Sequence, residues 1–206
     1  MNLYSEIIRE IENLDTESIP AERKQKLRQL ARIISGMTSR ENIPIVFICT
    51  HNSRRSILAQ VWCQTLSDYY AIHNLKCYSG GTESTAVYPG IIQTLKTQGF
   101  HIQKSGDGQN LQYLLRYGKD TEPLQLFSKK FSHPANPEEN FIAVMVCSDA
   151  DRHCPFVPGA SLRFSLPYTD PKTYDNTPQE ASAYLKKSRE IAAEIKFLLR
   201  HLKENL

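Results

Sequence analysis

Two short apolar runs, IPIVFI at 43–48 and FIAVMV at 141–146, constrain the fold of this 206-residue chain more than any other feature. Apolar runs of this length, without polar alternation, are typical of strands that are buried on both faces of a sheet. Two further candidate strands, LKCYSGG and LRFSLP, lie at 75–81 and 162–167. Segments in which apolar residues recur at helical spacing follow these strands, at 54–70, 89–100 and 177–203.

Strands that alternate with helices predict a doubly wound α/β fold, with a mostly parallel four-stranded sheet and helices on both faces. We expect residues 43–206 to form this domain. The segments LQYLLRY and LQLFSKKF predict a hairpin that is inserted in it at about 103–140. Residues 1–42 precede the domain and predict two amphipathic helices, an extension that packs or dimerises. The sequence TPQE, from Thr177 to Glu180, is a capping box that predicts the start of the final helix.

The composition limits the classes of partner. The net charge is +3, and the chain has no dense block of Lys and Arg, which argues against nucleic-acid binding. No run of about 18 apolar residues is present to suggest a membrane span. The N-terminal stretch MNLYSEIIREIENLD is acidic and lacks the apolar core of a signal peptide. We therefore expect a cytoplasmic protein without a nucleic-acid or membrane partner.

The segment CTHNSRRS, residues 49–56, leads from the first predicted strand directly into a helix. Backbone N–H groups of such a turn can converge on an anion, and the helix N-terminus adds partial positive charge. Arg55 can offer two parallel N–H donors to an oxyanion. The same field favours the thiolate form of Cys49, and Ser56 can donate to that thiolate. The alternative is a buried cysteine beside an arginine that caps the helix. The predicted oxyanion-binding residues are Thr50, His51, Asn52, Ser53, Arg54, Arg55 and Ser56.

The chain has five cysteines, an odd number without a dense disulfide pattern. In a reducing compartment such cysteines are free, metal-binding or catalytic. Cys63 and Cys77 lie within a predicted helix and a predicted strand, and we expect both in the core.

Cys147 ends a predicted strand, and Cys154 follows seven positions later. If this segment is helical, the two residues lie about 10.5 Å apart along its axis, whereas a disulfide needs Cα atoms within roughly 7 Å. A disulfide between them would therefore require the segment to bend or unwind. Zinc binding with His153 has poor ligand spacing, and two unrelated structural cysteines are the other alternative.

VFICTHNSRRSILAQ resembles the low-molecular-weight protein tyrosine phosphatase superfamily, whose loop is Cys-x5-Arg-Ser after the first strand. This superfamily includes phosphatases and thioredoxin-coupled arsenate reductases. The resemblance spans roughly residues 43–204 and is interrupted by 103–140. His51 stands where the family commonly has glycine, so we expect an unusual backbone angle there. Arg54 also departs from the family pattern and adds positive charge beside the anion.

The resemblance implies roles for residues outside the loop. Asp170, which precedes Pro171, would be the general acid, with Asp175 as a nearby competitor. CSDADRHCP, residues 147–155, resembles the arsenate-reductase branch, in which a strand ends in Cys-x6-Cys-Pro and three cysteines act in turn. By position, the nucleophile, the second thiol and the third thiol would be Cys49, Cys147 and Cys154.

These implications favour a thiol-dependent arsenate reductase, which converts arsenate to arsenite with reduced thioredoxin or a similar thiol as co-substrate. One alternative is a phosphatase of the same superfamily that acts on phosphotyrosine or small phosphomonoesters through a phosphocysteine. A second alternative is a non-catalytic oxyanion sensor. No metal or bound cofactor is expected, apart from a potassium ion that some relatives hold near the position of Asn52. A homodimer through the N-terminal helices is a further expectation.

Overall fold

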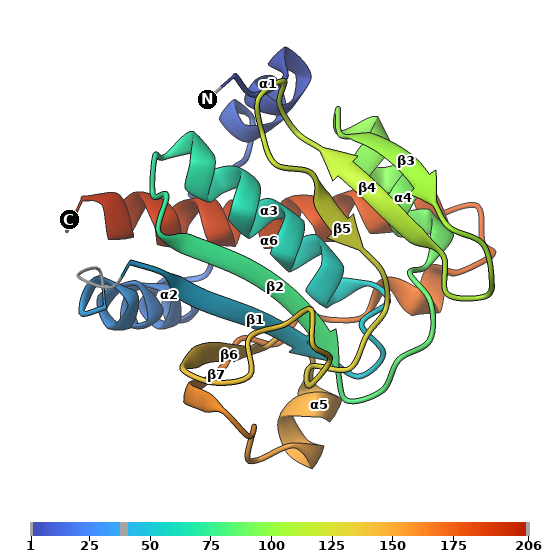
Figure 1. Ribbon diagram of the computed structural model, residues 1–206. Coiled ribbons are helices and arrows are strands. Elements are labelled where there is room, and N and C mark those ends of the chain that lie inside the picture. The colour runs from blue at the N-terminus through green and yellow to red at the C-terminus, as the bar shows by residue number, and fades with distance from the viewer. Residues whose placement is uncertain (1, 38–40, 205–206) are drawn as a thin grey trace.

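A four-stranded parallel sheet forms the centre of the molecule, in the order β2–β1–β6–β7 (Figure 1). The computed structural model describes residues 2–37 and 41–204. Helices flank the sheet, so the predicted fold class is confirmed. In chain order the four strands are β1 (Ile43–Cys49), β2 (Leu75–Gly81), β6 (Phe141–Met145) and β7 (Ala160–Ser165).

The two central strands are those with continuous apolar sequences. Every residue of β6 is buried, and in β1 only Pro44 is partly exposed, as expected of strands covered on both faces. Beyond the paired region, the N–H of Val146 donates to the carbonyl of Ile48 at 2.8 Å. β1 and β6 therefore end side by side, which brings Cys49 and Cys147 to the same edge of the sheet.

Helix α3 (Arg55–Tyr69) connects β1 to β2 and packs between the sheet and the long helix α6 (Glu180–Lys203). It is buried almost all round, and the side chain of Trp62 is fully buried. The indole N–H of Trp62 donates to the Ser188 Oγ of α6 at 2.9 Å. Within the described ranges, no helix has the length and apolar content needed to cross a membrane.

The start of α6 differs from the prediction. The helix begins at Glu180, and Thr177 does not cap it: its hydroxyl donates to the carbonyl of Tyr174 at 2.7 Å. Glu180 reaches back to the N–H of Asn176 at 2.6 Å, one residue beyond the expected partner. Asn176 has a φ of 61°, so a turn occupies the place of the predicted first helical turn. The predicted end near residue 203 is confirmed.

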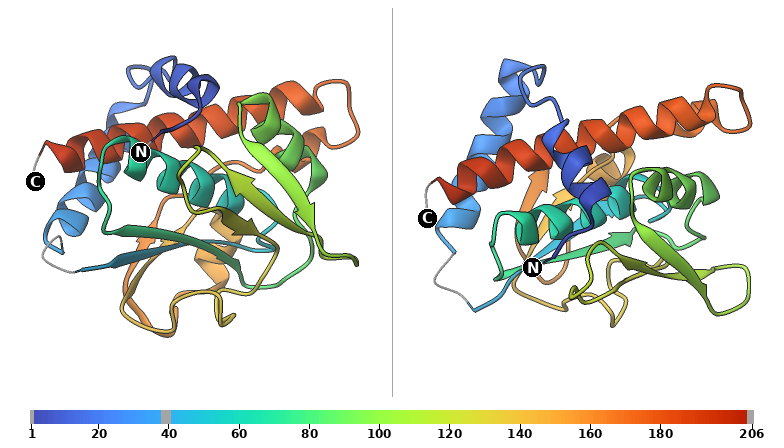
Figure 2. Two further views of the ribbon diagram at one scale, coloured as in Figure 1. Left: turned by 45° about the horizontal axis from the view of Figure 1, so that its top comes forward. Right: turned by 90° about the horizontal axis from the view of Figure 1, so that it is seen from above.

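The two predicted N-terminal helices are present as α1 (Ser5–Glu12) and α2 (Ala21–Ser35), which pack on α6 (Figure 2). Their apolar side chains, such as Ile7 and Leu27, are fully buried within the same chain. The apolar faces that suggested a dimer contact are thus already covered, and the homodimer stays a prediction.

The inserted segment follows α4 (Pro89–Thr97) and is larger than the predicted hairpin. β4 (Gln112–Arg116) and β5 (Leu124–Leu126) form the hairpin, and β3 (His101–Ser105) pairs with β4 as a third antiparallel strand. The insertion also contacts the N-terminus, since the N–H of Tyr4 donates to the carbonyl of Tyr117 at 3.0 Å. The remaining elements are two short helices, α5 (Ser148–His153) between β6 and β7, and a 3₁₀ helix (Pro171–Tyr174) between β7 and α6.

Candidate active site

The loop of residues 50–54 leaves β1 after Cys49 and enters α3 at Arg55. Among the described residues, the backbone N–H groups of 51–54 donate to no protein acceptor. Four free donors at the N-terminus of a 15-residue helix form a cradle for an anion. The unusual backbone angle lies at Asn52, with a φ of 46°, and not at His51 as predicted. Asparagine tolerates this conformation better than most residues, so the loop keeps its turn without the glycine.

A chain of hydrogen bonds leads to the sulfur atom at the base of the loop. The Sγ of Cys49 lies 3.1 Å from the Oγ of Ser56, and that oxygen accepts from the Nδ2 of Asn52 at 2.8 Å. All three residues are buried. Because Asn52 donates to the Ser56 oxygen, the hydroxyl proton of Ser56 is free to point at the sulfur, where it stabilises negative charge.

Residues of the insertion form hydrogen bonds to the loop. The Ser128 hydroxyl donates to the carbonyl of His51 at 2.7 Å, and the N–H of Lys129 donates to the Oδ1 of Asn52 at 3.0 Å. Gly81 allows the close approach of the loop, since a Cβ atom there would lie 2.6 Å from the carbonyl oxygen of Thr50. The ammonium of Lys129 is buried over the Phe127 ring, and this burial lowers its pKa to about 8.

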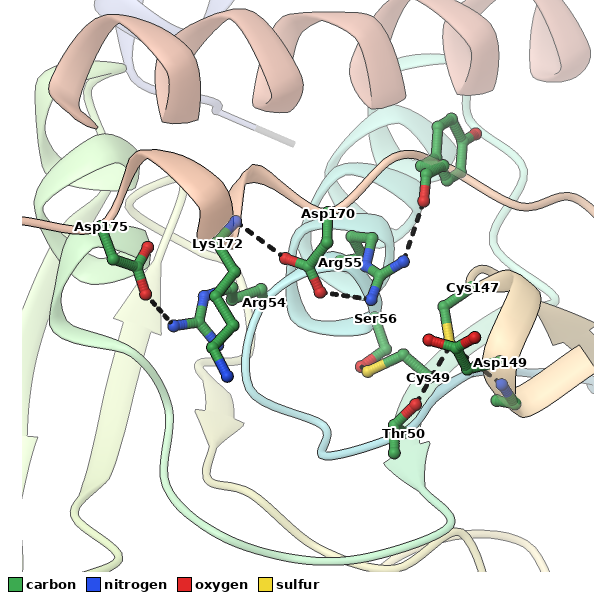
Figure 3. A network of polar contacts seen from close by, with 12 residues as sticks. Cys49, Thr50, Arg54, Arg55, Ser56, Cys147, Asp149, Asp170, Lys172 and Asp175 are labelled. Carbon is green, nitrogen blue, oxygen red and sulfur yellow. Dashed lines mark hydrogen bonds and ion pairs between the residues drawn. The ribbon is translucent and has the colours of Figure 1, made fainter. Parts of the chain in front are cut away.

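Arg55 joins the loop to the segment that carries Asp170 (Figure 3). Its Nη1 donates to the carbonyl of Tyr168 at 2.9 Å, and its Nη2 pairs with the Asp170 carboxylate. Its Nε is buried and has no partner among the described residues. The other carboxylate oxygen of Asp170 accepts from the N–H of Lys172 at 3.1 Å, at the start of the 3₁₀ helix. Asp170 keeps 34% of its side chain exposed, so it faces both the loop and solvent.

Arg54 pairs with a different carboxylate, that of Asp175. Its Nη2 lies 2.5 Å from the Oδ2 of Asp175, its Nε donates to the Tyr184 hydroxyl at 2.6 Å, and its guanidinium stacks on Tyr88. The Tyr184 hydroxyl donates to Asp175 in turn, and burial together with this bond raises the pKa of Tyr184. Asp175, the alternative candidate for the general acid, is therefore engaged by Arg54 and Tyr184. The imidazole of His51 lies 3.4 Å from Glu83 at the surface. His51 and Arg54 thus leave only their backbone N–H groups for an anion.

Cys147 contacts the loop, whereas Cys154 lines a cavity of about 330 Å³ together with Thr50. The Sγ of Cys147 lies 3.4 Å from the Oγ1 of Thr50 and accepts from the N–H of Ala150 at 3.2 Å, which makes Cys147 the cap of α5. Cys154 is at the other end of this helix, and its thiol donates to the carbonyl of Phe156 at 3.3 Å. Cys49, Cys147 and Cys154 are all free thiols.

Arg163 of β7 holds the end of α5 that carries Cys154. Its Nη2 lies 2.6 Å from the Oδ1 of Asp151, and its Nε donates to the carbonyl of Cys154 at 3.0 Å. Asp151 also accepts from the Ser165 hydroxyl at 2.6 Å. Any change that unwinds α5 must break these contacts.

Protein groups engage both ends of the Asn52 amide, and the potassium ion near this residue stays a prediction. Its Oδ1 already accepts from Lys129 and its Nδ2 already donates to Ser56. The group of the insertion that contacts Asn52 is the backbone N–H of Lys129. In the parts of the chain that the structure describes, no group of three or more His, Cys, Asp or Glu side chains is arranged to hold a metal ion.

The sequence reasoning missed several residues of the site, namely Arg23, Ser128, Lys129 and Arg163. None of them belongs to a motif, and each reaches the site through the fold. Arg23 and Arg163 are arginines on a helix and a strand, where such side chains are usually solvated, and Ser128 and Lys129 lie in a connecting segment, so no sequence signal marked them.

Comparisons with known proteins agree with the sequence resemblance. The family model described as low molecular weight phosphotyrosine protein phosphatase matches residues 44–112. Arsenate reductase 2 of Staphylococcus epidermidis is 29% identical over 128 residues, which cover 62% of this chain and 77% of that protein. Arsenate reductase of Bacillus subtilis is 26% identical over 151 residues, which cover 73% of this chain and 89% of that protein.

The fold has solved counterparts as well. A low molecular weight phosphotyrosine phosphatase from Vibrio cholerae O395 superposes with a TM-score of 0.52 at 13% identity, covering 77% of this chain and 95% of that one. The structural likeness concerns the fold. Together, the sequence and structural matches confirm the resemblance to this superfamily and its arsenate-reductase branch, and they bear out the expectation of an enzyme of one of these two types.

Proposed function

We propose that this protein is a thiol-dependent arsenate reductase that uses the oxyanion loop and a relay of three cysteines. The observation that carries the proposal is the position of Cys147. Its sulfur contacts Thr50, next to the nucleophile, and it caps the helix whose other end is Cys154. A phosphatase needs one thiol at this loop and has no use for the other two. The arsenate reductases among the relatives support the same conclusion.

In the first step, arsenate binds in the cradle of free N–H groups and on Arg55. The unpaired Nε of Arg55 gives the anion a donor that no protein group uses. As Arg55 turns to the anion, the Asp170 carboxyl is released and can hold the proton that the leaving oxygen needs. The Cys49 thiolate attacks arsenic, an S–As bond forms, and the departing oxygen leaves as water.

In the second step, the Cys147 thiolate attacks the sulfur of Cys49. A Cys49–Cys147 disulfide forms, the S–As bond breaks, and its electron pair stays on arsenic, which leaves as arsenite. Arsenic is reduced by two electrons, and the two sulfur atoms are oxidised. The displacement at sulfur resembles thiol–disulfide exchange, which requires an accessible attacking thiolate and a good leaving group.

In the third step, Cys154 attacks the sulfur of Cys147 and releases Cys49 as a thiolate. The two cysteines flank the six-residue helix α5. Seven residue steps at the helical rise correspond to about 10.5 Å along the axis, whereas a disulfide needs Cα atoms within roughly 7 Å. Helix α5 must therefore unwind, and the contacts of Arg163 must break. The resulting Cys147–Cys154 disulfide would be exposed to solvent, where thioredoxin or a similar dithiol can reduce it and complete the cycle.

A phosphatase is the second candidate, because the match to the phosphatase family model includes the whole loop. Cys49, Arg55 and Asp170 would act in the same way on a phosphomonoester, and water would then hydrolyse the phosphocysteine. This activity needs neither Cys147 nor Cys154, which separates the two candidates by experiment.

The experiment is a single turnover of the fully reduced protein with arsenate, followed by mass mapping of disulfides. We expect one arsenite per chain and a Cys147–Cys154 disulfide. Cys147→Ser should abolish arsenite release, whereas Cys63→Ser, a buried cysteine in α3, should leave it unchanged. Hydrolysis of p-nitrophenyl phosphate without any disulfide would identify a phosphatase. Anion binding without either reaction would identify an oxyanion sensor.

A further inference from the structure

Arg23 of α2 lies between α6 and the segment that leads to Asp170. Its Nε lies 2.9 and 2.8 Å from the two carboxylate oxygens of Glu194, and its guanidinium lies 4.6 Å from the centre of the Tyr168 ring. Glu194 and Tyr168 are both buried. We propose that Arg23 is a positioning residue for the oxyanion site, through which the N-terminal segment takes part in anion binding. The inference rests on the proposed use of Arg55 as an oxyanion ligand.

Tyr168 transmits this contact to the site through its main chain. Its N–H donates to the carbonyl of Val146 at 3.1 Å, and its carbonyl accepts from the Nη1 of Arg55 at 2.9 Å. Asp170 follows two residues later and pairs with the same guanidinium. The position of the Tyr168 peptide therefore fixes the orientation of Arg55 and the reach of Asp170.

Residues 167–169 form a thin wall between two cavities. A cavity of about 620 Å³ lies on the side of Arg23, and one of about 420 Å³ lies on the side of Arg55 and Asp170. Pro167, Tyr168 and Thr169 line both of them. Although the Tyr168 side chain is buried, the two cavities leave space on both sides of this segment. Arg23, which stacks on the Tyr168 ring from the side of the larger cavity, is one of the neighbours that resist its displacement.

The chemistry of the contact requires an arginine. Burial raises the pKa of Glu194 and the charge of Arg23 opposes this rise, so each member of the pair depends on the other. The Nε–H of Arg23 is shared between both carboxylate oxygens, and the flat face of the guanidinium packs on the aromatic ring. A lysine would keep the charge but lose the planar contact.

Two variants test the proposal without leaving a buried charge unpaired. Arg23→Lys keeps the ion pair, and the double variant Arg23→Met with Glu194→Gln removes both charges together. The matched control is Arg28→Met, because Arg28 is also on α2 and stacks on Phe197 of α6, at 5.3 Å. This variant loses a contact between a guanidinium and an aromatic ring across the same two helices, and it does not involve Tyr168.

The measurement is the dissociation constant of inorganic phosphate, read from its protection of Cys49 against alkylation, with the melting temperature of each variant. We expect the double variant to bind phosphate about 10- to 100-fold more weakly, with Arg23→Lys between it and the wild type. The alkylation rate without phosphate should not change, since Ser56 keeps its contact with Cys49 and Asn52 keeps its bond to Ser56. Arg28→Met should bind phosphate as the wild type does.

Two outcomes would overturn the inference, and they are distinguishable. If the wild type is protected by phosphate and the folded double variant is protected equally well, Arg23 has no positioning role and the proposed function stands. If phosphate does not protect the wild type, the oxyanion site itself is refuted, and the proposed function falls with it.

Discussion

The Sγ of Cys49 and the Oγ of Ser56 lie 3.1 Å apart, and the Asn52 amide donates to that same oxygen. The hydroxyl proton of Ser56 is thereby directed at the sulfur. In the proposed cycle Cys49 carries negative charge before it attacks arsenic and again when Cys154 releases it. One hydroxyl can stabilise the sulfur at both stages.

Ser56→Ala should slow turnover while anion binding remains close to normal. A hydrogen bond to a charged group contributes about 1.5–3 kcal/mol, which corresponds to a rate lower by roughly 10- to 150-fold. Single-turnover arsenite release measures this rate. Ser161→Ala is the control, since Ser161 is in β7 and its hydroxyl donates to the Phe141 carbonyl. Equal rates for the two variants would exclude a role for the Ser56 hydroxyl.

Asp170→Asn and Asp175→Asn should have different effects, although the two carboxylates lie in one segment. Asp170 faces Arg55 and solvent, and loss of a general acid lowers the rate by about 10²–10⁴-fold. Asp175 is engaged by Arg54 and Tyr184, so its loss should lower stability more than the chemical rate. The measurements are kcat/KM and the melting temperature of both variants. A larger loss of rate in Asp175→Asn would reverse the assignment.

Cys154→Ser should stop the relay one step before its end. We expect this variant to release one arsenite per chain and to retain a Cys49–Cys147 disulfide, because no third thiol is present to resolve it. Peptide mapping without reducing agent identifies the bond. Detection of free Cys49 and Cys147 after arsenite release would contradict the order of the three thiols.

Arg163→Ala should favour the disulfide form of Cys147 and Cys154. The variant loses contacts that hold α5 in its helical, reduced state, and contacts of this kind contribute about 1–2 kcal/mol. The reduction potential should therefore become more negative by roughly 20–45 mV, and amide exchange in α5 should be faster. Arg152→Ala removes an exposed ion pair with Asp149 on the same helix and is the control. Identical potentials in the two variants would show that Arg163 does not restrain α5.

Lys129 should give the stability of the protein a distinct pH dependence. Burial lowers its pKa from 10.5 to about 8 in the folded chain. Between these pH values the unfolded chain binds a proton that the folded chain does not, so the free energy of unfolding should rise as the pH increases. The rise attributable to Lys129 amounts to about 3 kcal/mol.

Urea unfolding at pH 7, 8.5 and 10 tests this expectation. Lys129→Met should lack the additional rise, and Lys130→Met, which changes an exposed neighbour, should retain it. The difference between wild type and variant isolates Lys129 from the tyrosines and cysteines that titrate in the same range. A constant difference across these pH values would be inconsistent with a depressed Lys129 pKa.

The central strands and the oxyanion loop could be predicted because their signals are contiguous. β1 and β6 are covered on both faces, so each is a continuous apolar run in the sequence. The loop is likewise eight residues in a row, and its position between strand and helix is visible without the structure. Asp170 was found through the family resemblance, since Asp-Pro pairs alone are common in turns.

The residues that hold the loop and Arg55 in place could not be predicted in this way. Lys129 reaches Asn52 across 77 residues, and Arg23 reaches Glu194 across 171. Lys129 makes this contact through its backbone N–H and Arg23 through its side chain, and only the packing of the insertion and of α2 brings these partners together. The N-terminal helices were expected to pack or to dimerise, whereas one of their side chains also stacks on the residue that holds Arg55.

The wall of residues 167–169 also has a pharmacological consequence. The larger cavity behind it is lined by several residues from 13 to 23, which lie outside the region that matches the phosphatase family model. A small molecule in that cavity would reach Tyr168 from the side opposite Arg55 and would displace the wall without entering the oxyanion loop. Such a compound would be a non-competitive inhibitor with respect to the anion. Its selectivity would come from the N-terminal segment and not from the oxyanion loop, which lies within the region that matches the family model.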